Sequence, residues 1–229
     1  MTRDPIREEA FESRWEAAPA VASVIALQVL LAVVSMVQGW TIWHFDWWVW
    51  LVPAIPEALL LGALAFDAPR HRLEQMGKRR EFALGLLGVV SLSNALLLVA
   101  VLASLINGQE HSGGQLLLKA GTVWGTNTIT YGLWFWAIDQ GGPVRRCQPD
   151  PPPPDFQFPQ MENPQLAEPG WFPRLVDYLY VSLTNSIAFS PTDAMPLTRR
   201  AKLLMASESV VSVLTTLLVA ARAVNIFRG

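Results

Sequence analysis

Five stretches of this chain are each long and apolar enough to form a helix that crosses a lipid bilayer. They cover residues 18–38, 48–66, 82–106, 116–138 and 203–226. A helix needs about 20 apolar residues to span a hydrocarbon layer of roughly 30 Å. A bilayer offers no water to unpaired backbone groups, so such runs must be helical or close into a barrel. Barrel strands alternate polar and apolar residues, and these stretches do not. The sequence therefore predicts an all-α integral membrane protein.

The composition agrees with a membrane protein and gives no support for an enzyme. Hydrophobic residues make up 52% of the 229 positions and charged residues 16%, whereas a soluble domain is about a quarter charged. The single cysteine, Cys147, excludes an internal disulfide and a multi-cysteine metal cluster. No catalytic triad or phosphate-binding loop stands out, and no basic stripe indicates a nucleic-acid partner. We expect the lipid bilayer as partner, no cofactor, no metal and no catalysis.

The distribution of polar and apolar residues divides the chain into four parts. Residues 1–17 mix both charge signs and lack the pattern of a signal peptide. Residues 18–138 hold four predicted transmembrane helices, and residues 174–229 hold a short apolar stretch, a turn and a final helix. The connecting loop, 139–173, is rich in proline and includes the run Pro151–Pro154. Proline favours extended backbone, so we expect this loop to be non-helical.

The distribution of Lys and Arg predicts the orientation in the membrane. With five spans, one face carries 14 of the 17 basic residues. They are Arg3, Arg7, Arg14, Arg70, Arg72, Lys78, Arg79, Arg80, Arg145, Arg146, Arg174, Arg199, Arg200 and Lys202. The other face has Lys119, Arg222 and Arg228. Because basic residues concentrate on the cytoplasmic side, the N-terminus is predicted to be cytoplasmic, in the cell membrane of a multi-pass protein.

The stretch 175–189 is too short and too polar for a comfortable span. It has 15 residues and includes Asp177, Thr184, Asn185 and Ser186. A half-inserted helix followed by irregular backbone is tolerated at membrane depth only where protein or a water-filled cavity surrounds it. We therefore expect a re-entrant half-helix and loop beside about five spans. A six-span alternative, in which 175–189 crosses the membrane, also fits the charges.

The segment from Tyr178 to Asn225 resembles the pore module of bacterial potassium-channel-type proteins. That module consists of a pore helix, a Thr-Val-Gly-Tyr-Gly-Asp filter and an inner helix. The residues that carry the resemblance are Tyr180, Ser182, Thr184, Asp193, Pro196, Glu208 and Arg222. The chain also resembles a family of uncharacterised bacterial multi-spanning membrane proteins, through Trp-Ala-Ile-Asp-Gln-Gly-Gly-Pro and Asp-Phe-Gln-Phe-Pro-Gln-Met. The second resemblance implies no activity.

The filter-like positions depart from the channel pattern. The resemblance implies pore or filter roles for Thr184, Asn185, Ser190, Pro191, Thr192 and Asp193. A potassium filter needs inward carbonyls from successive residues, with glycines that allow backbone angles closed to other residues. Pro191 fixes its own φ and restricts Ser190 before it, so we expect a degenerate filter without potassium selectivity. With a cytoplasmic N-terminus, this loop also lies on the cytoplasmic side, whereas the channel filter lies outside.

Several polar residues lie inside the predicted spans, where polar groups are often functional. They are Glu57, Asn94, Thr126, Thr130, Glu208 and Ser212. Glu57 falls near the middle of its stretch, so we expect it to face other helices, with Asn94 or Glu208 as partner. Thr126 and Thr130 share a helix face, which favours close helix packing. Glu208 and Ser212 belong to a polar stripe that either lines a pore or packs against 116–138.

Two functional hypotheses follow. The first is a channel-related membrane protein whose degenerate pore loop allows at most weakly selective ion passage. The channel resemblance implies a homo-oligomer, a tetramer, for this case. The alternative is a non-conducting membrane sensor or scaffold that retains the shape of the pore module, with the proline-rich loop as its partner-binding surface.

The first prediction concerns topology. Single cysteines placed in the loop 67–81 of a Cys147→Ser background should resist membrane-impermeant thiol reagents added to intact cells, because the charge bias puts this loop in the cytoplasm. The measurement is labelling before and after permeabilisation, and a cysteine in the loop 107–115 is the outward-facing control. Ready labelling of the first loop in intact cells would contradict the orientation.

Overall fold

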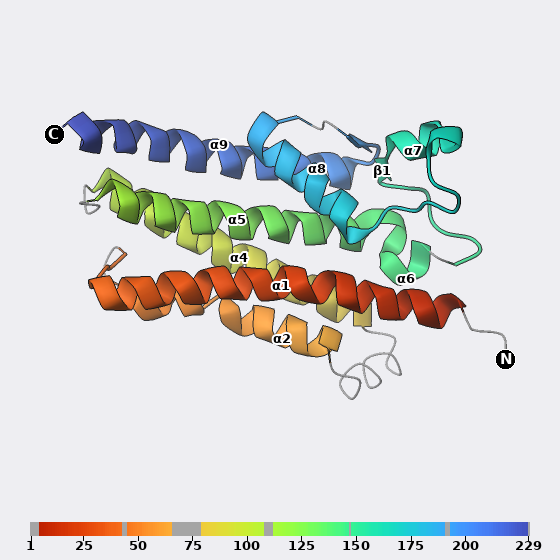
Figure 1. Ribbon diagram of the computed structural model, residues 1–229, viewed down its shortest axis with the longest axis horizontal. Helices are drawn as coiled ribbons and strands as arrows, with labels where there is room; N and C mark the ends of the chain where they lie inside the picture. The colour runs from red at the N-terminus through yellow and green to blue at the C-terminus, as the bar shows by residue number, and fades with distance from the viewer. Residues whose placement is uncertain are drawn as a thin grey trace.

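The computed structural model describes residues 5–42, 45–65, 79–107, 112–146, 148–190 and 193–228. Within these ranges the chain is mostly helical and all-α, with eight α-helices and one two-stranded pairing of two residues per strand. The expected helical fold class is confirmed at this level. Four of the helices are long, and they lie lengthwise in a bundle (Figure 1).

The first half of the chain forms a long helix and a broken one. Helix α1 runs over Pro5–Gln38 without interruption, so it starts well before the apolar stretch predicted at 18. The stretch predicted at 48–66 is not one helix. A 3-10 turn, η1 (Trp47–Leu51), precedes α2 (Ala54–Ala65). The break lies at Pro53, because proline has no N–H for the helical ladder and its ring clashes with the preceding turn.

The next two helices agree with the predicted stretches. Helix α4 covers Arg79–Ile106 and α5 covers Gly113–Ile138. The Ser112 side chain accepts a hydrogen bond from the Gln115 amide and so caps the start of α5. Helix α5 is central, since it packs against α1, α4, α8 and α9. Its many buried positions therefore include polar side chains as well as apolar ones.

The proline-rich connection is folded, contrary to the expectation of an extended loop. It contains η2 (Asp139–Gly141), α6 (Pro143–Arg146), β1 (Phe156–Gln157), α7 (Pro159–Glu162) and η3 (Pro164–Leu166). Only part of it, including Pro151–Pro154, lacks helix and strand. Prolines open α7 and η3, where a missing N–H is tolerated. We call the folded segment 139–173 the cap.

The last part of the chain leaves the cap and returns to it. Helix α8 (Leu175–Ala188) has 14 residues and ends at Phe189, which adopts the left-handed conformation at φ 56°. The chain then reaches β2 (Met195–Pro196), which pairs antiparallel with β1 of the cap. Helix α9 (Arg199–Arg228) starts there and runs to the opposite end of the bundle (Figure 1). The segment that contains α8 is therefore attached to the cap at both of its ends.

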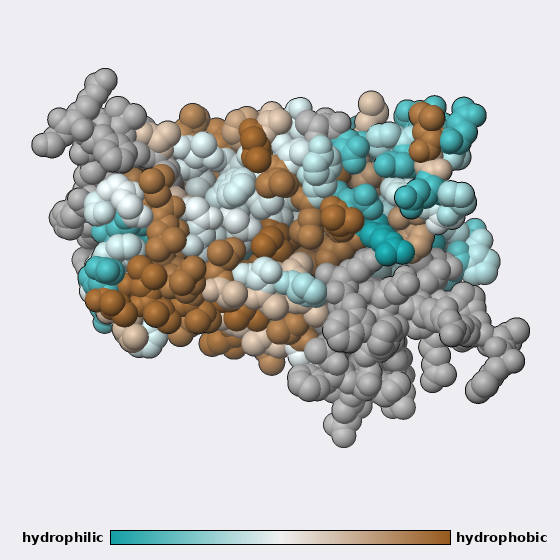
Figure 2. All heavy atoms as spheres, viewed as in Figure 1, coloured by the Kyte–Doolittle hydropathy of each residue, from teal (hydrophilic) through white to brown (hydrophobic). Residues whose placement is uncertain are grey.

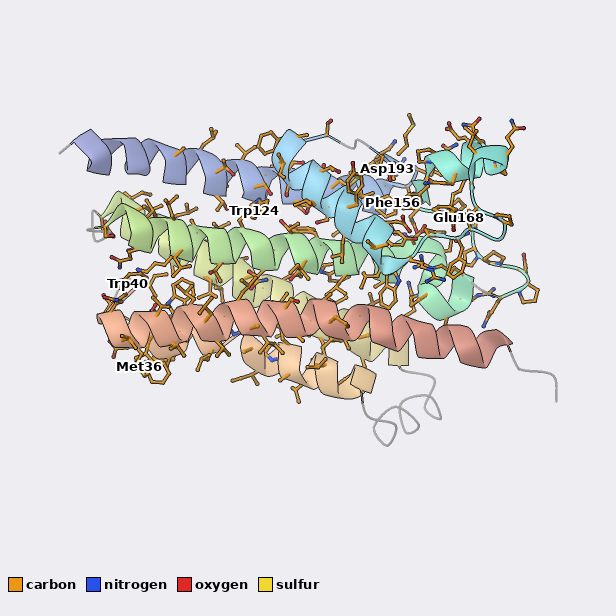
Figure 3. All side chains as sticks on the ribbon, in the orientation of Figure 1. Met36, Trp40, Trp124, Phe156, Glu168 and Asp193 are labelled. Carbon is orange, nitrogen blue, oxygen red and sulfur yellow. The ribbon has the colours of Figure 1, made fainter. Side chains whose placement is uncertain are left out.

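Apolar side chains cover much of the bundle, and polar ones gather at the cap. In Figure 2, hydrophobic residues cover the visible face over α1 and α2, whereas hydrophilic residues concentrate over the end that holds α6 and α7. Figure 3 places Met36 and Trp40 at one end of the bundle and Phe156, Glu168 and Asp193 at the other. Two helical stretches, Ala17–Gln38 and Arg80–Ile106, are long and apolar enough to cross a membrane.

Helices α5 and α8 lie very close together at Gly132. A Cβ atom at this position would lie 2.7 Å from Leu179 Cδ2 and 3.1 Å from Leu179 Cα. A backbone atom cannot move aside as a side chain can, so this crossing requires a residue without a side chain. Two other glycines of α5 are less crowded, because an added Cβ would meet no atom within 4 Å at Gly121 and would lie 3.6 Å from Leu27 Cδ1 at Gly125.

We predict that Gly132→Ala weakens the docking of α8. The added methyl would overlap Leu179, and overpacking of this kind costs about 1–3 kcal/mol of stability. Gly121→Ala is the matched control, because a Cβ there meets no atom within 4 Å. Its better helix propensity should leave stability unchanged or raise it by up to about 1 kcal/mol. The measurement is unfolding of the purified protein in detergent, and equal effects of both substitutions would contradict the assignment.

Candidate functional site

The filter-like residues lie at the end of α8 and in the segment that returns to the cap. Thr184 and Asn185 belong to the last half of α8, Ser190 is exposed just beyond it, and Asp193 is partly buried. The Thr184 hydroxyl donates to the Tyr180 and Val181 carbonyls of its own helix. The positions 191 and 192 lie outside the described residues. The predicted absence of a carbonyl ladder at 190–193 therefore remains a prediction.

The polar face of α8 is buried against α5. Ser182, Asn185 and Ser186 are each at most 2% exposed. Ser182 Oγ lies 2.6 Å from the Thr128 carbonyl oxygen of α5, and the Thr128 hydroxyl donates to Ser186 Oγ over 3.4 Å. These contacts pair polar groups of the half-helix with polar groups of a neighbouring helix, as burial requires.

The polar stripe of α9 is also buried, and its Glu208 bonds to the polar face of α8. Glu208 is 1% exposed, and Ser212 and Thr215 are each 3% exposed. Asn185 Nδ2 donates to Glu208 Oε2 over 2.7 Å, and Ser182 Oγ contacts Glu208 Oε1. These three residues are therefore buried within one chain, on a helix that packs against α5, α8 and α4. The structure therefore supports the packing alternative for these residues.

Glu57 faces the bundle and has a polar partner, as expected, but the expected partners were wrong. Gln28 Nε2 of α1 donates to Glu57 Oε1 over 2.8 Å, and Glu57 is 2% exposed. Asn94 instead donates to the Thr130 hydroxyl over 3.3 Å. Sequence spacing favoured α4 because a short loop joins it to α2. The contact with α1 depends on the rotation of the helices, which spacing does not determine.

The threonines on α5 bond mainly within their own helix. Thr126 donates to the Val123 carbonyl and Thr130 to the Thr126 carbonyl, over 3.0 and 2.7 Å. Such bonds let a buried hydroxyl stay satisfied without a partner on another helix. Among the described side chains, Gln28 Oε1 and Glu57 Oε2 are buried without a hydrogen-bond partner.

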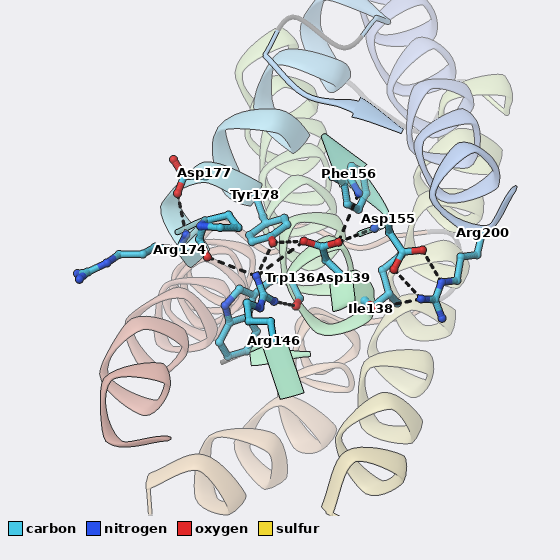
Figure 4. Close-up of polar contacts among 11 residues, drawn as sticks. Trp136, Ile138, Asp139, Arg146, Asp155, Phe156, Arg174, Asp177, Tyr178 and Arg200 are labelled. Atoms are coloured by element: carbon cyan, nitrogen blue, oxygen red, sulfur yellow. Dashed lines mark hydrogen bonds and ion pairs between the residues drawn. The ribbon is translucent and has the colours of Figure 1, made fainter. Parts of the chain in front are cut away.

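A buried charged cluster at the cap was missed by sequence reasoning. Asp139 is fully buried directly after α5, and its carboxylate accepts from the Asp155 and Phe156 amides of the cap, over 2.7 and 3.3 Å. The Tyr178 hydroxyl of α8 also donates to it, and Arg146 lies 4.0 Å away (Figure 4). This cluster joins α5, the cap and α8.

Arg146 itself is held from several directions. Its guanidinium donates to the Pro173 and Trp136 carbonyls and to the Tyr178 hydroxyl, and it lies 4.9 Å from the centre of the Tyr178 ring. The Arg146 side chain is only 3% exposed. A buried charge of this kind is tolerated only when it is paired and hydrogen-bonded.

A second ion pair attaches the start of α9 to the cap. Arg200 donates through Nε and Nη2 to the two carboxylate oxygens of Asp155, both over 2.6 Å. The Thr198 hydroxyl also donates to Asp155, which is fully buried. The hydrogen bonds between Arg200 and Asp155 raise the pKa of the Arg200 guanidinium above its ordinary value. The bidentate geometry fixes direction as well as distance.

The charged cluster is suited to holding elements together rather than to reacting. The Asp139 and Asp155 carboxylates are already hydrogen-bonded to arginine, hydroxyl or amide donors. Within the described residues, no group of three His, Cys, Asp or Glu side chains could hold a metal ion. The sequence signal was the aspartate after a helix, followed by Gly-Gly-Pro and two arginines, together with Asp155. Nothing in the spacing indicated that these residues meet.

We predict that Arg146→Gln and Arg145→Gln differ strongly in effect. Removing one partner of a buried ion pair costs about 3–5 kcal/mol, because the Asp139 carboxylate loses its counter-charge. Arg145 is the adjacent residue and is exposed, with a hydrogen bond to Gln148, so its loss should cost about 0–1 kcal/mol. Unfolding in detergent measures both. Similar losses from the two variants would contradict a structural role of the buried cluster.

Comparisons with known proteins leave the site to be interpreted from its own contacts. No family model, no curated protein and no solved structure matches this chain.

Proposed function

We propose that this chain is a multi-spanning membrane protein that keeps the shape of a pore module and uses it for packing, as a non-conducting sensor or scaffold. The observation that carries the proposal is the burial of the α9 stripe within a single chain. Glu208, Ser212 and Thr215 are at most 3% exposed, and they belong to a helix that packs against α5, α8 and α4. Side chains enclosed in this way are not available to line a path between subunits.

The proposal includes five membrane spans and a half-helix. The spans are α1, the unit of η1 and α2, α4, α5 and α9. Helix α8 would extend about 21 Å at 1.5 Å per residue, which is short of the hydrocarbon thickness of roughly 30 Å. Its two ends are tied to the cap through Asp139 and through the β1–β2 pairing. A re-entrant course from the cap side fits these contacts better than a sixth span.

The orientation and the partner surface follow from the charge bias. If the N-terminus is cytoplasmic, the cap lies on the cytoplasmic side, because α1 starts beside α6. In the sensor or scaffold function, the cap is the surface that meets a soluble partner. Its outer residues include Leu166, which is 84% exposed, and the exposed prolines Pro151 and Pro153. Because the two buried carboxylates of the cap, Asp139 and Asp155, are engaged in structural hydrogen bonds, we propose no enzymatic activity.

A second candidate function is weakly selective ion passage through a homotetramer. The outer face of α8 favours it, because Val176, Tyr180 and Ile187 are between 50% and 66% exposed in one chain. These side chains would face either lipid or a neighbouring copy. In a tetramer, a path would then follow α8 and the segment after it, not the buried stripe of α9.

We predict no potassium-selective flux through the purified protein in liposomes. Proline at 191 is incompatible with the carbonyl geometry of a potassium filter. The measurement compares potassium and sodium uptake, together with the oligomeric state in detergent, and protein-free liposomes are the control. Flux without selectivity in a tetramer would favour the second candidate, and strong potassium selectivity would overturn the degenerate-filter prediction.

A further inference from the structure

The carboxyl group of Glu208 lies between the half-helix α8 and the first turns of α9. Only 1% of the residue is exposed. Its Oε2 atom accepts a hydrogen bond from Asn185 Nδ2 over 2.7 Å, and its Oε1 atom contacts Ser182 Oγ. Both partners belong to α8. This carboxyl therefore contacts α8 through two side chains. The number of hydrogens that these side chains can donate indicates whether Glu208 itself carries a proton.

The orientation of the Asn185 amide is fixed by its other neighbours. Nδ2 donates to the Met205 carbonyl over 3.0 Å, and Oδ1 accepts from the Ser209 hydroxyl over 3.2 Å. A flipped amide would place its oxygen against the Met205 carbonyl, which has no hydrogen to share. The two hydrogens on Nδ2 therefore go to Met205 and to Glu208 Oε2. Asn185 has none left for the other carboxyl oxygen.

The Ser182 hydroxyl has one hydrogen and two neighbouring acceptors. Ser182 Oγ lies 2.6 Å from the Thr128 carbonyl oxygen and also contacts Glu208 Oε1. The Thr128 carbonyl can only accept, so the Ser182 hydrogen points toward it. The contact between Ser182 Oγ and Glu208 Oε1 then lacks a hydrogen. A protonated Glu208 supplies it, because its own O–H donates to Ser182 Oγ.

The charges around Glu208 favour the same protonation state. Among the described residues, no Lys, Arg or His forms an ion pair with Glu208. From α5, the Tyr131 phenol donates to Ser207, next to Glu208. From α8, the ionisable side chains are Asp177, Tyr178 and Tyr180, and none of them is a cation. On α9, Arg200 is engaged with Asp155, and Lys202 is exposed. A buried carboxylate without a counter-charge is strongly disfavoured.

We propose that Glu208 is a proton-binding site, and that its bound proton holds α8 against α5 and α9. On release, the Glu208 O–H bond breaks and the proton passes to water. The carboxylate and the Thr128 carbonyl then compete for the single Ser182 hydrogen, and a negative charge stays buried between the helices. Both changes weaken the contact of the half-helix with its neighbours. Because this site lies within one chain, it does not depend on whether the protein conducts.

Infrared spectroscopy of the purified protein tests the protonation directly. A protonated carboxyl group has its own C=O stretching band, distinct from that of a carboxylate. We expect wild-type protein at neutral pH to show this band and Glu208→Gln to lose part of it. Among the residues whose burial is described, Glu57 is the other buried carboxyl without a cationic partner, so Glu57→Gln serves as the matched control and isolates the Glu208 contribution. A band that Glu208→Gln leaves unchanged, in wild-type and Glu57→Gln backgrounds alike, would overturn the proposal.

A second measurement tests the coupling to α8. Gln at 208 can accept from Asn185 and donate to Ser182, so it imitates the protonated acid at every pH. A reporter cysteine at the exposed Ile187 position, in a Cys147→Ser background, reports on the end of α8. We expect its labelling to increase more steeply with pH in wild-type protein than in Glu208→Gln, where only thiol ionisation contributes. Identical pH profiles would show that the proton does not control α8. Liposome flux tests the proposed function separately and does not affect either result.

Discussion

The buried carboxylate of Asp139 is the interaction on which the rest of the arrangement depends. It receives hydrogen bonds from two backbone amides of the cap and from Tyr178 of α8, and it pairs with Arg146. It thereby joins the end of α5, the returning chain of the cap and the start of α8, and Arg146 contacts the same three parts. The surrounding aromatic rings of Phe135, Phe156 and Phe158 exclude water from the cluster, which strengthens every polar contact inside it.

The half-helix depends on a second set of constraints. It starts at the cap, crosses α5 at Gly132, and has its polar face enclosed by α5 and α9. Apolar packing alone would leave the rotation of a 14-residue helix poorly determined. The paired contacts of Ser182 and Asn185 with Glu208 specify that rotation, because buried polar groups must find their partners. A helix of only 14 residues can therefore be held firmly by its polar contacts with neighbouring helices.

The two unusual carboxyls of the bundle differ in how they are satisfied. Both oxygens of Glu208 have partners on α8, whereas Glu57 has one partner, Gln28 on α1, and one oxygen without a described partner. Sequence alone could mark both as buried and polar. It could not distinguish them, because the difference lies in which neighbouring helix turns a donor toward each oxygen. Asn94 illustrates this, since it lies at a suitable depth and bonds to Thr130 instead.

The sequence by itself determined the helical class and the approximate bounds of α4, α5 and α9. These features follow from local hydropathy and helical periodicity, which a linear pattern contains. The sequence predicted a single helix over 48–66, and the structure breaks this stretch at Pro53, between η1 and α2. The folded cap, the Asp139 and Asp155 ion pairs, the Gln28–Glu57 contact and the crossing at Gly132 were decided only by the tertiary structure. Each joins residues far apart in the chain, and their meeting depends on helix rotation and loop path, which no local spacing specifies.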